Sequence, residues 1–420
     1  MKNEFFHAIK IVWENCTGCT RCVRVCPTQA LRVRNGKVQL DSRRCIDCGK
    51  CVTTCPYKAL RTTADNLDSI KKFKFKMAII STTYAGQFAE NIDYPTAKRA
   101  LFELGFDDVA SEAMVTEMMS RMIRDYINEH KDTRPIISSH CPAIVRLIQV
   151  RFSSLLPNIL HIEAPMSVLA LYFKDKICRE KNLSEDEVGI FMIVPCPAQV
   201  TAVHQPEGTY KNAQDGAISI QEIYQQAMCK MKEASESDRE IEIYPGGLSW
   251  AISGSQADEI DDGNIRTLAV SGINNVIKIL HKMENHQLDH YDFVVMHSCI
   301  NGCVGGVLNV ENPFIASSRI KRLLRTAKHK NFKDKYFYDM FLKGKFDVKP
   351  LEPRSIMHLD DTIKSAIQKM KQIQLISQKL PGLDCSACGS PSCEVLAEDI
   401  VDGKATIADC VVLLREKQKK

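Results

Sequence analysis

Sixteen of the eighteen cysteines fall into four groups whose spacing suits a soft metal. Two groups are compact runs, CTGCTRCVRVCP at 16–27 and CIDCGKCVTTCP at 45–56. A third group is dispersed along the middle of the chain, at Cys141, Cys196, Cys299 and Cys303, and a fourth closes it, at Cys385, Cys388, Cys393 and Cys410. Cysteine thiolates are the ligands of iron–sulfur clusters. The pattern therefore predicts electron transfer connected to a buried metal site.

Both compact runs have the spacing C-x2-C-x2-C-x3-C-P, which is typical of bacterial two-cluster ferredoxins. In this arrangement three close cysteines hold one cubane and the fourth reaches the other. We expect one [4Fe–4S] cluster on Cys16, Cys19, Cys22 and Cys55, and a second on Cys45, Cys48, Cys51 and Cys26. Zinc is the alternative for paired CxxC units, and two complete runs that each end in proline disfavour it. The intervening LRVRNGKVQL alternates about Asn35-Gly36, which predicts a hairpin.

Bulk composition narrows the class of protein. The chain has 420 residues, 45% hydrophobic and 25% charged, as ordinary globular proteins do, and its net charge of +5 gives little reason to expect nucleic acid. No apolar run is long enough to span a membrane, and the N-terminus MKNEFFHAIK lacks the apolar core of a signal peptide. A disulfide framework belongs to small secreted domains. We therefore expect a cytoplasmic protein with reduced, metal-bound cysteines.

The middle of the chain predicts an α/β domain. KMAIIST, GIFMIVPC and FVVMHSC read as buried strands, whereas AIVRLIQVRFSSLL and SVLALYFKDKIC have helical spacing of apolar residues. The dispersed cysteines follow apolar runs, in IISSHCPA, MIVPCPAQ and VVMHSCINGCVGG. Loops at the carboxyl ends of strands converge on one site, so four distant thiols can meet there. Gly302, Gly305 and Gly306 are expected to permit close approach of the backbone to a bulky group.

These three segments resemble the signature loops of the [FeFe]-hydrogenase catalytic domain. QPEGTYKNAQDGAISIQEIY, YPGGLSWAISGSQA and CVGGVLNVENPFIA are also typical of that family, and the resemblance extends over essentially the whole chain. It implies an α/β catalytic domain at 66–360, an α+β ferredoxin domain with two [4Fe–4S] clusters at 1–65, and a small helical iron–sulfur module at 361–420.

The resemblance also implies an H-cluster. Cys141, Cys196 and Cys299 would be ligands of its cubane, and Cys303 would be the fourth ligand that bridges to a di-iron unit with CO, CN and dithiolate ligands. Hydrogen would be converted reversibly to two protons and two electrons at the open iron, and the accessory cubanes would carry the electrons.

Several residues depart from the family pattern. His140 stands where catalytic members have a cysteine that relays protons, and Gln199 replaces a lysine that bonds a cyanide. The glutamine that usually follows the S-P pair of a later helix is missing at Pro165-Met166-Ser167, and the segment of His297 and Ser298 is one residue longer than usual. Such residues set the electronics and proton delivery of a metal site, so slow turnover is expected.

The C-terminal cysteines predict a third accessory cubane, with zinc as the alternative. They follow IKSAIQKMKQIQLISQKL, whose apolar period predicts a helix, and EVLAEDIV predicts another. A cluster at this place is typical of the sensory subgroup of [FeFe]-hydrogenases, and the chain resembles the form without a PAS domain. Cys178 and Cys229 are interpreted as small buried hydrophobes in helices and not as ligands.

The sequence thus predicts an anaerobic hydrogenase-like oxidoreductase whose biological role is hydrogen or redox sensing. The alternatives are an ordinary hydrogenase that exchanges electrons with ferredoxin, and an electron-transfer subunit that holds only cubanes. The expected partners are H2, protons and a redox or signalling protein, without nucleic acid or membrane; the sequence leaves a homodimer open.

Overall fold

The structure, a computed structural model, describes residues 5–327, 330, 332–354 and 363–418. The chain divides into two compact units, one of residues 1–62, 149–151 and 353–420, and the other of residues 63–148 and 152–352. The expected boundary between residues 360 and 361 lies outside the described residues. Within the described ranges, no helix is both long and apolar enough to cross a bilayer.

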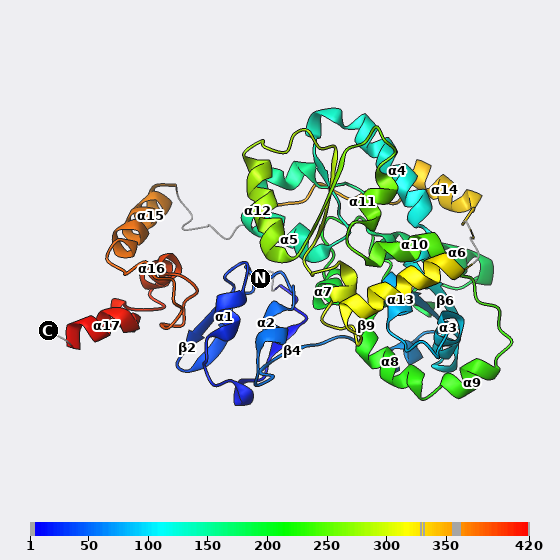
Figure 1. Ribbon diagram of the computed structural model, residues 1–420, viewed down its shortest axis with the longest axis horizontal. Coiled ribbons are helices and arrows are strands. Elements are labelled where there is room, and N and C mark those ends of the chain that lie inside the picture. The colour runs from blue at the N-terminus through cyan, green and yellow to red at the C-terminus, as the bar shows by residue number, and fades with distance from the viewer. Residues whose placement is uncertain (1–4, 328–329, 331, 355–362, 419–420) are drawn as a thin grey trace. The chain divides into compact units, whose positions relative to one another are not determined.

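The N-terminal part of the first unit is built from two small antiparallel sheets and two short helices, drawn in blue in Figure 1. One sheet pairs β1 (Ile9–Ile11) with β4 (Leu60–Thr62), and the other pairs β2 (Leu31–Arg34) with β3 (Lys37–Leu40). The helices are α1 (Arg21–Val25) and α2 (Lys50–Thr54). The predicted hairpin is confirmed: Asn35 and Gly36 have φ of 51° and 72°, as a two-residue turn that matches strand twist requires.

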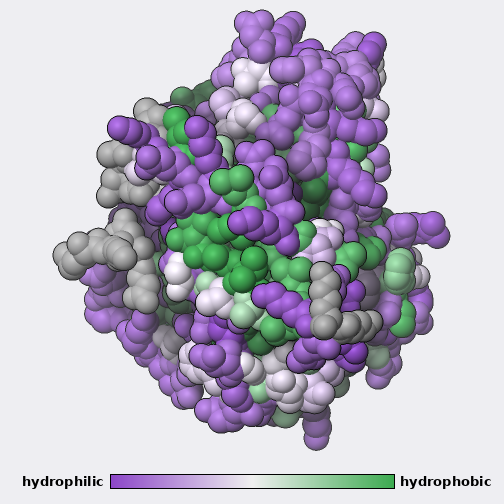
Figure 2. Space-filling view, turned by 90° about the vertical axis from the view of Figure 1, so that its left-hand side faces the viewer, coloured by the Kyte–Doolittle hydropathy of each residue, from purple (hydrophilic) through white to green (hydrophobic). Residues whose placement is uncertain are grey.

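The C-terminal part of the same unit is helical, with α15 (Ile363–Ser377), α16 (Cys393–Val401) and α17 (Val411–Gln418). Both predicted helices are present. Leu380, Leu396 and Ala397 form its small core. α15 and α17 also leave large apolar side chains exposed, including Ile367, Met370, Leu375, Val411 and Leu414. Figure 2 shows hydrophobic side chains gathered on one face of the molecule.

The second unit contains two parallel sheets. The first has the order β6-β5-β8-β9, formed by Asp108–Ser111, Phe75–Ile80, Val188–Val194 and Gly216–Ser219. The second has the order β10-β11-β7, formed by Thr267–Ser271, Phe293–His297 and Ile136–Ile137. All seven residues of β8 are buried, as expected for a parallel strand covered on both faces. The predicted α/β class is present, and the strands belong to two sheets because pairing is decided by tertiary contacts.

Helices surround these sheets (Figure 1). They are α3 (Tyr94–Glu103), α4 (Thr116–Glu129), α5 (Pro142–Arg151), α6 (Pro165–Lys181), α7 (Pro197–His204), α8 (Ile220–Met228), α9 (Met231–Glu236), α10 (Pro245–Leu248), α11 (Ser255–Ile260), α12 (Ile273–Glu284), α13 (Pro313–Thr326) and α14 (Lys335–Leu342). Proline is at the first or second position of α5 and α7, where its missing N–H costs no hydrogen bond. These two helices begin directly after Cys141 and Cys196, so their starts fix where both cysteines lie.

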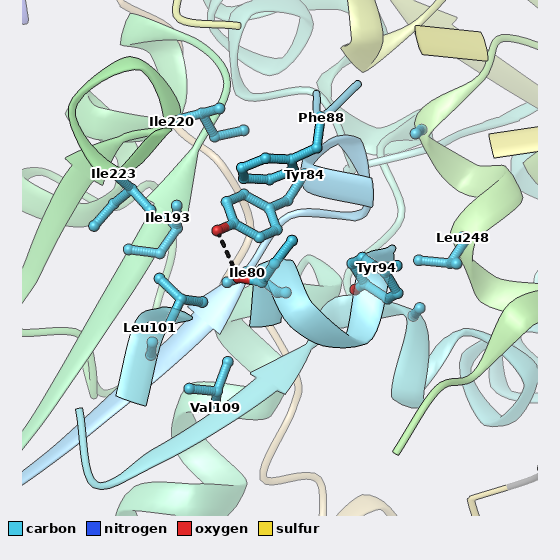
Figure 3. Close-up of a cluster of buried hydrophobic side chains, with 14 of the residues drawn as sticks. Ile80, Tyr84, Phe88, Tyr94, Leu101, Val109, Ile193, Ile220, Ile223 and Leu248 are labelled. Atoms are coloured by element: carbon cyan, nitrogen blue, oxygen red, sulfur yellow. Dashed lines mark hydrogen bonds between the residues drawn. The ribbon is translucent and has the colours of Figure 1, made fainter. Parts of the chain in front are cut away.

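A hydrophobic cluster packs helices and loops against the four-stranded sheet. Ile80 and Ile193 come from neighbouring strands and meet Leu101, Ile220 and Ile223 from helices (Figure 3). The Tyr84 hydroxyl satisfies its hydrogen bond inside this cluster by donating to the Ala97 carbonyl at 3.0 Å. The cluster stabilises the carboxyl edge of the sheet, from which the Cys196 loop leaves.

Candidate metal centres

The first predicted ligand set converges beside α1. Cys22 lies in α1, Cys55 ends α2, and a pocket is lined by Cys16, Cys19, Cys22 and Cys55. Burial, together with nearby Cys19 and Cys55, raises the pKa of the Cys22 thiol to about 11. The backbone N–H groups of Val38 and Ala59 donate to the sulfurs of Cys16 (3.4 Å) and Cys55 (3.3 Å). A pocket lined by four thiols, with N–H groups aimed at sulfur, fits a cubane.

The second predicted set is equally close. Burial raises the pKa of Cys48 to about 12, with Cys26 as the next cause, and raises those of Cys45 and Cys51, which also interact with Cys26. The structure therefore places the fourth cysteine of each run beside the other run's group. Cys51 also interacts with Cys22, so the two sets are neighbours.

Sequence reasoning missed a buried pair beside this second set. The His7 ring lies between the Asp47 carboxylate and the Ser42 carbonyl, 2.8 Å from each. His7, Cys45 and Asp47 place ligand atoms within 4.8 Å of one another. Both ring nitrogens of His7 already have polar partners, so the pair supports the loop that carries Cys45. A histidine forty residues from its partner gives no local signal.

The third set draws its cysteines from both sheets. Cys141 follows β7 and precedes α5, Cys196 follows β8 and precedes α7, and Cys299 follows β11. After burial, the Cys303 pKa is raised most by Cys141, then by Glu112, Cys196 and Cys299. The structure therefore brings all four predicted thiols together. The glycines also permit close approach of the chain to itself: a Cβ on Gly306 would lie 2.4 Å from the Pro195 carbonyl oxygen, and one on Gly302 would lie 2.6 Å from the Ser253 nitrogen.

Positive potential compensates part of the cost of holding these thiolates. Burial raises the pKa of Cys196 to about 12, whereas the N–H groups of Gln199 and Ala198 and the Arg146 charge lower it. Ala143 and Ile144 act in the same way on Cys141 at the start of α5. Helix N-termini and nearby arginines favour thiolates. Arg146 is fully buried and is held by the carbonyls of Ala198 and Gln205, both at 3.2 Å.

Polar side chains beside this set have unsatisfied atoms among the described residues. Nδ1 of His140, both ring nitrogens of His297 and Oε1 of Gln199 are buried without a hydrogen-bond partner there. The His140 and His297 rings lie 5.9 Å apart. Each unsatisfied buried polar atom costs about 1–3 kcal/mol, so their grouping beside four thiols fits a polar group bound there. Burial lowers the pKa of His140 and takes that of His297 to about 3.

Glu112 is a buried acid that the sequence did not indicate. Its Oε1 accepts hydrogen bonds from Ser81 Oγ (2.8 Å), Thr82 N (2.7 Å) and Thr82 Oγ1 (3.0 Å). Its charge acts on Cys303 and also raises the His140 pKa against the effect of burial. The Glu112 carboxylate thus favours the protonated form of His140.

The fourth set forms the C-terminal module. Burial raises the pKa of Cys388, with contributions from Cys410 and Cys385, and Cys388, Cys393 and Cys410 pack together. Asp384 Oδ1 accepts the Cys393 N–H at 2.7 Å and fixes the start of α16. The two excluded cysteines are apart from all four sets in sequence, Cys178 in α6 and Cys229 after α8. Cys229, which we expected to be buried, is exposed because it lies at the end of its helix.

Three family models match this chain. Residues 74–244 match the iron only hydrogenase large subunit, C-terminal domain, residues 15–59 match the 4Fe-4S dicluster domain, and residues 380–412 match the Fe-S cluster family FeS.

Solved structures share the fold. One is a variant of the [FeFe]-hydrogenase HydA1 from Chlamydomonas reinhardtii, with a TM-score of 0.54 and 13% identity over 69% of this chain and 98% of that one. A second variant of the same protein has a TM-score of 0.52 and 14% identity, over 67% and 95%. The HydA(deltaEFG) structure, which concerns stepwise H-cluster assembly, has a TM-score of 0.53 and 13% identity, over 69% and 98%.

A curated relative is an uncharacterized protein of Methanocaldococcus jannaschii, 38% identical over 52 residues. That match spans 12% of this chain and 23% of the relative's length.

Fold and family models together define the class. By domain and fold the chain is an iron–sulfur, [FeFe]-hydrogenase-like protein: residues 74–244 match the hydrogenase large-subunit domain, residues 15–59 match a 4Fe-4S dicluster domain, and solved [FeFe]-hydrogenase structures share the fold.

Proposed function

We propose that the protein binds H2 and oxidises it reversibly but slowly at an H-cluster, and that it serves as a hydrogen or redox sensor. One observation carries the proposal: Cys141, Cys196, Cys299 and Cys303 meet beside buried histidine and glutamine atoms that lack partners among the described residues. Four thiols suit a cubane, and the polar atoms suit the ligands of a di-iron unit.

The four cysteines would hold the H-cluster, and Cys303 would bridge its two parts. When bound, the di-iron unit supplies the open iron at which H2 is split. The protein contributes the helix starts at Ala143 and Ala198 and the buried Arg146, which favour the ligating thiolates. Gln199 offers an amide without the positive charge of lysine, so it orients a polar ligand with less electrostatic stabilisation.

His140 would carry protons to and from this site. Its ring is nearly buried and burial lowers its pKa, so the imidazole is neutral at pH 7 and accepts a proton only briefly. Efficient proton transfer requires a pKa near the working pH. A buried neutral histidine therefore supports slow turnover, which suits detection of hydrogen more than bulk conversion.

The other twelve grouped cysteines would hold three accessory [4Fe–4S] clusters, which pass electrons to a redox or signalling protein. All eighteen cysteines are free thiols. The proposal includes a cytoplasmic, reducing and anaerobic setting, because thiols that hold metal must stay reduced.

Anaerobic maturation with the di-iron cofactor tests this function. Infrared bands of bound CO and CN, together with slow turnover under H2, are the expected result. Cubane iron without such bands would make the chain an electron-transfer subunit, and fast turnover with ferredoxin would make it an ordinary hydrogenase; either outcome would refute the sensor proposal.

A further inference from the structure

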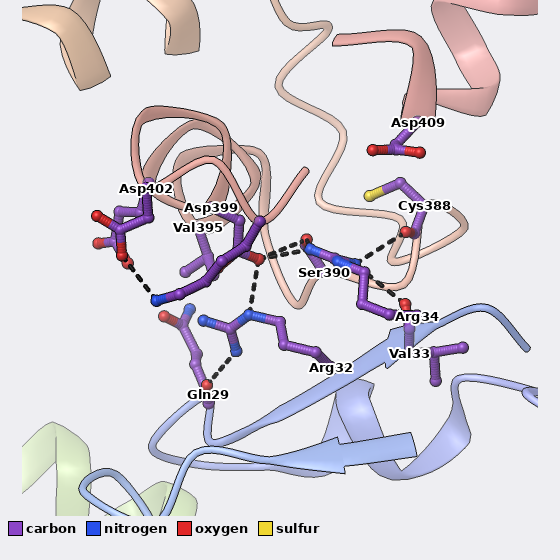
Figure 4. Close-up of polar contacts among 12 residues, drawn as sticks. Gln29, Arg32, Val33, Arg34, Cys388, Ser390, Val395, Asp399, Asp402 and Asp409 are labelled. Atoms are coloured by element: carbon purple, nitrogen blue, oxygen red, sulfur yellow. Dashed lines mark hydrogen bonds and ion pairs between the residues drawn. The ribbon is translucent and has the colours of Figure 1, made fainter. Parts of the chain in front are cut away.

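The β2–β3 hairpin of the ferredoxin part contacts the C-terminal cysteine loop through β2. Side chains alternate along β2, so Leu31 and Val33 pack toward the ferredoxin core while Arg32 and Arg34 face α16. Figure 4 shows both arginines at the Asp399 carboxylate. Arg32 Nε donates to Asp399 Oδ2 at 2.8 Å, and Arg34 Nη2 donates to the same oxygen at 2.5 Å.

This contact is largely buried, and several hydrogen bonds hold it together. Asp399 is 6% exposed and Ser390 is 0% exposed. Ser390 Oγ accepts from Arg34 Nη2 at 2.7 Å and donates to Asp399 Oδ2 at 3.1 Å. The Val33 N–H donates to the Gly389 carbonyl at 2.8 Å, so the loop covers the open edge of β2. A Cβ on Gly389 would lie 2.1 Å from the Val33 carbonyl oxygen, so only glycine fits there.

The contact brings net positive charge to the C-terminal cysteines. Two guanidinium groups face one carboxylate, so the group formed by Arg32, Arg34 and Asp399 carries one net positive charge. Arg34 Nη1 also donates to the carbonyl of Cys388 at 3.3 Å. Arg34 therefore favours extra negative charge on this loop.

We propose that Arg34 is a positioning residue of the C-terminal cluster: it holds the Cys388 loop on the ferredoxin hairpin, and its charge raises the reduction potential of that cluster. This rests on the proposed [4Fe–4S] cluster at Cys385, Cys388, Cys393 and Cys410. Reduction adds one electron to the cluster and moves no bond or proton, so nearby positive charge stabilises the reduced form. The same hairpin donates the Val38 N–H to Cys16, so one element touches ligands of two cluster sets.

The test is a redox titration of the full-length chain, reconstituted anaerobically with iron and sulfide and followed by electron paramagnetic resonance. In Arg34→Gln we expect at least a tenfold fall in the ratio of reduced to oxidised C-terminal cluster at a fixed potential, equal to about 59 mV for a one-electron couple. Arg34→Lys keeps the positive charge, so the potential of its C-terminal cluster should stay close to that of the wild type. Asp399→Asn removes the opposing carboxylate and should move the potential upward.

Arg44→Gln is the matched control. Arg44 pairs with Glu398 of the same helix at 2.8 Å, so its loss removes an ion pair from the same contact. We expect little change in the potential, since the Asp399 contact remains. Equal shifts in Arg34→Gln and Arg44→Gln, no shift in Arg34→Gln, or a downward shift in Asp399→Asn would overturn the role of Arg34.

The outcome also separates this proposal from the one it rests on. If the wild-type chain lacks a third cubane signal, the cluster assignment fails and not the electrostatic argument. If Arg34→Gln alone loses its cluster, the opposite shift in Asp399→Asn and the retained potential of Arg34→Lys still decide the question.

Discussion

Replacing His140 by phenylalanine separates proton transfer from packing. The His140 ring lies 5.9 Å from the rings of both Trp250 and His297, and phenylalanine fills a similar volume in that place. The substitution removes a buried nitrogen that lacks a partner among the described residues, which relieves about 1–3 kcal/mol. We therefore expect His140→Phe to be at least as stable as the wild type in thermal melts.

The same variant should lose turnover. A positioned acid or base contributes about 10²–10⁴-fold, which corresponds to about 3–5.5 kcal/mol in the barrier. Since burial keeps His140 neutral near pH 7, wild-type hydrogen evolution should rise as the pH falls below 6.5, whereas the variant should show no such rise. Turnover is measured after anaerobic maturation, with infrared bands of CO and CN as the check on cofactor loading.

His297→Phe is the comparison variant, because His297 is 2% exposed and its ring nitrogens also lack partners among the described residues. It should gain similar stability and lose less than tenfold in rate. Equal rate losses in the two variants would mean that pocket shape, and not proton transfer, controls the rate. An unchanged rate in His140→Phe would leave His140 as a packing residue.

Three further variants test the site and the fold. Cys303→Ser should abolish the CO and CN infrared bands, because an alcohol is a poor ligand for iron in this setting; unchanged bands would refute its bridging role. Lys98→Met should stabilise the protein by about 2 kcal/mol at pH 7. Burial lowers the Lys98 pKa from 10.5 to about 8, which destabilises the folded state by about 3 kcal/mol below pH 8. The hydrogen bond from Lys98 to the Glu242 carbonyl offsets about 1 kcal/mol of that cost. The gain, read from melting curves, should shrink as the pH rises above 8, and equal stability at pH 7 would contradict it. Glu163→Gln tests a buried acid. Burial raises the Glu163 pKa from 4.5 to about 7, so the protonated carboxyl contributes stability that is fully present below pH 4.5 and is lost as the pH rises through 7. Relative to the wild type, the variant should gain about 2.4 kcal/mol of unfolding free energy between pH 5 and pH 7.5, and a difference that does not change with pH would refute the argument.

Local sequence patterns predict many of the individual elements of the fold. The Asn35-Gly36 turn, the buried run of β8 and the apolar period of α15 depend on interactions within a few residues, so the sequence predicts them directly. The pairing of β7 with β11 and of β5 with β8 depends on contacts between distant segments. For that reason one predicted α/β domain proved to hold two sheets.

The cysteine groups could be predicted from the sequence because soft-metal ligation requires a fixed residue type at a limited set of spacings. The sequence also indicated His140 and Gln199 as candidate site residues, since each stands next to or near a predicted ligand. Glu112 and His7 were not, because a buried acid or histidine has no spacing rule and acts through partners far along the chain.

The sequence alone therefore determined which thiols form each group, since ligand chemistry is written in residue type and spacing. Only the tertiary structure decided what surrounds each group: the Glu112 charge beside Cys303 and His140, the unsatisfied ring nitrogens of His297, and the Arg34 contact with the loop of Cys388. Burial and electrostatics depend on which distant segments pack together, and these surroundings set pKa values and potentials.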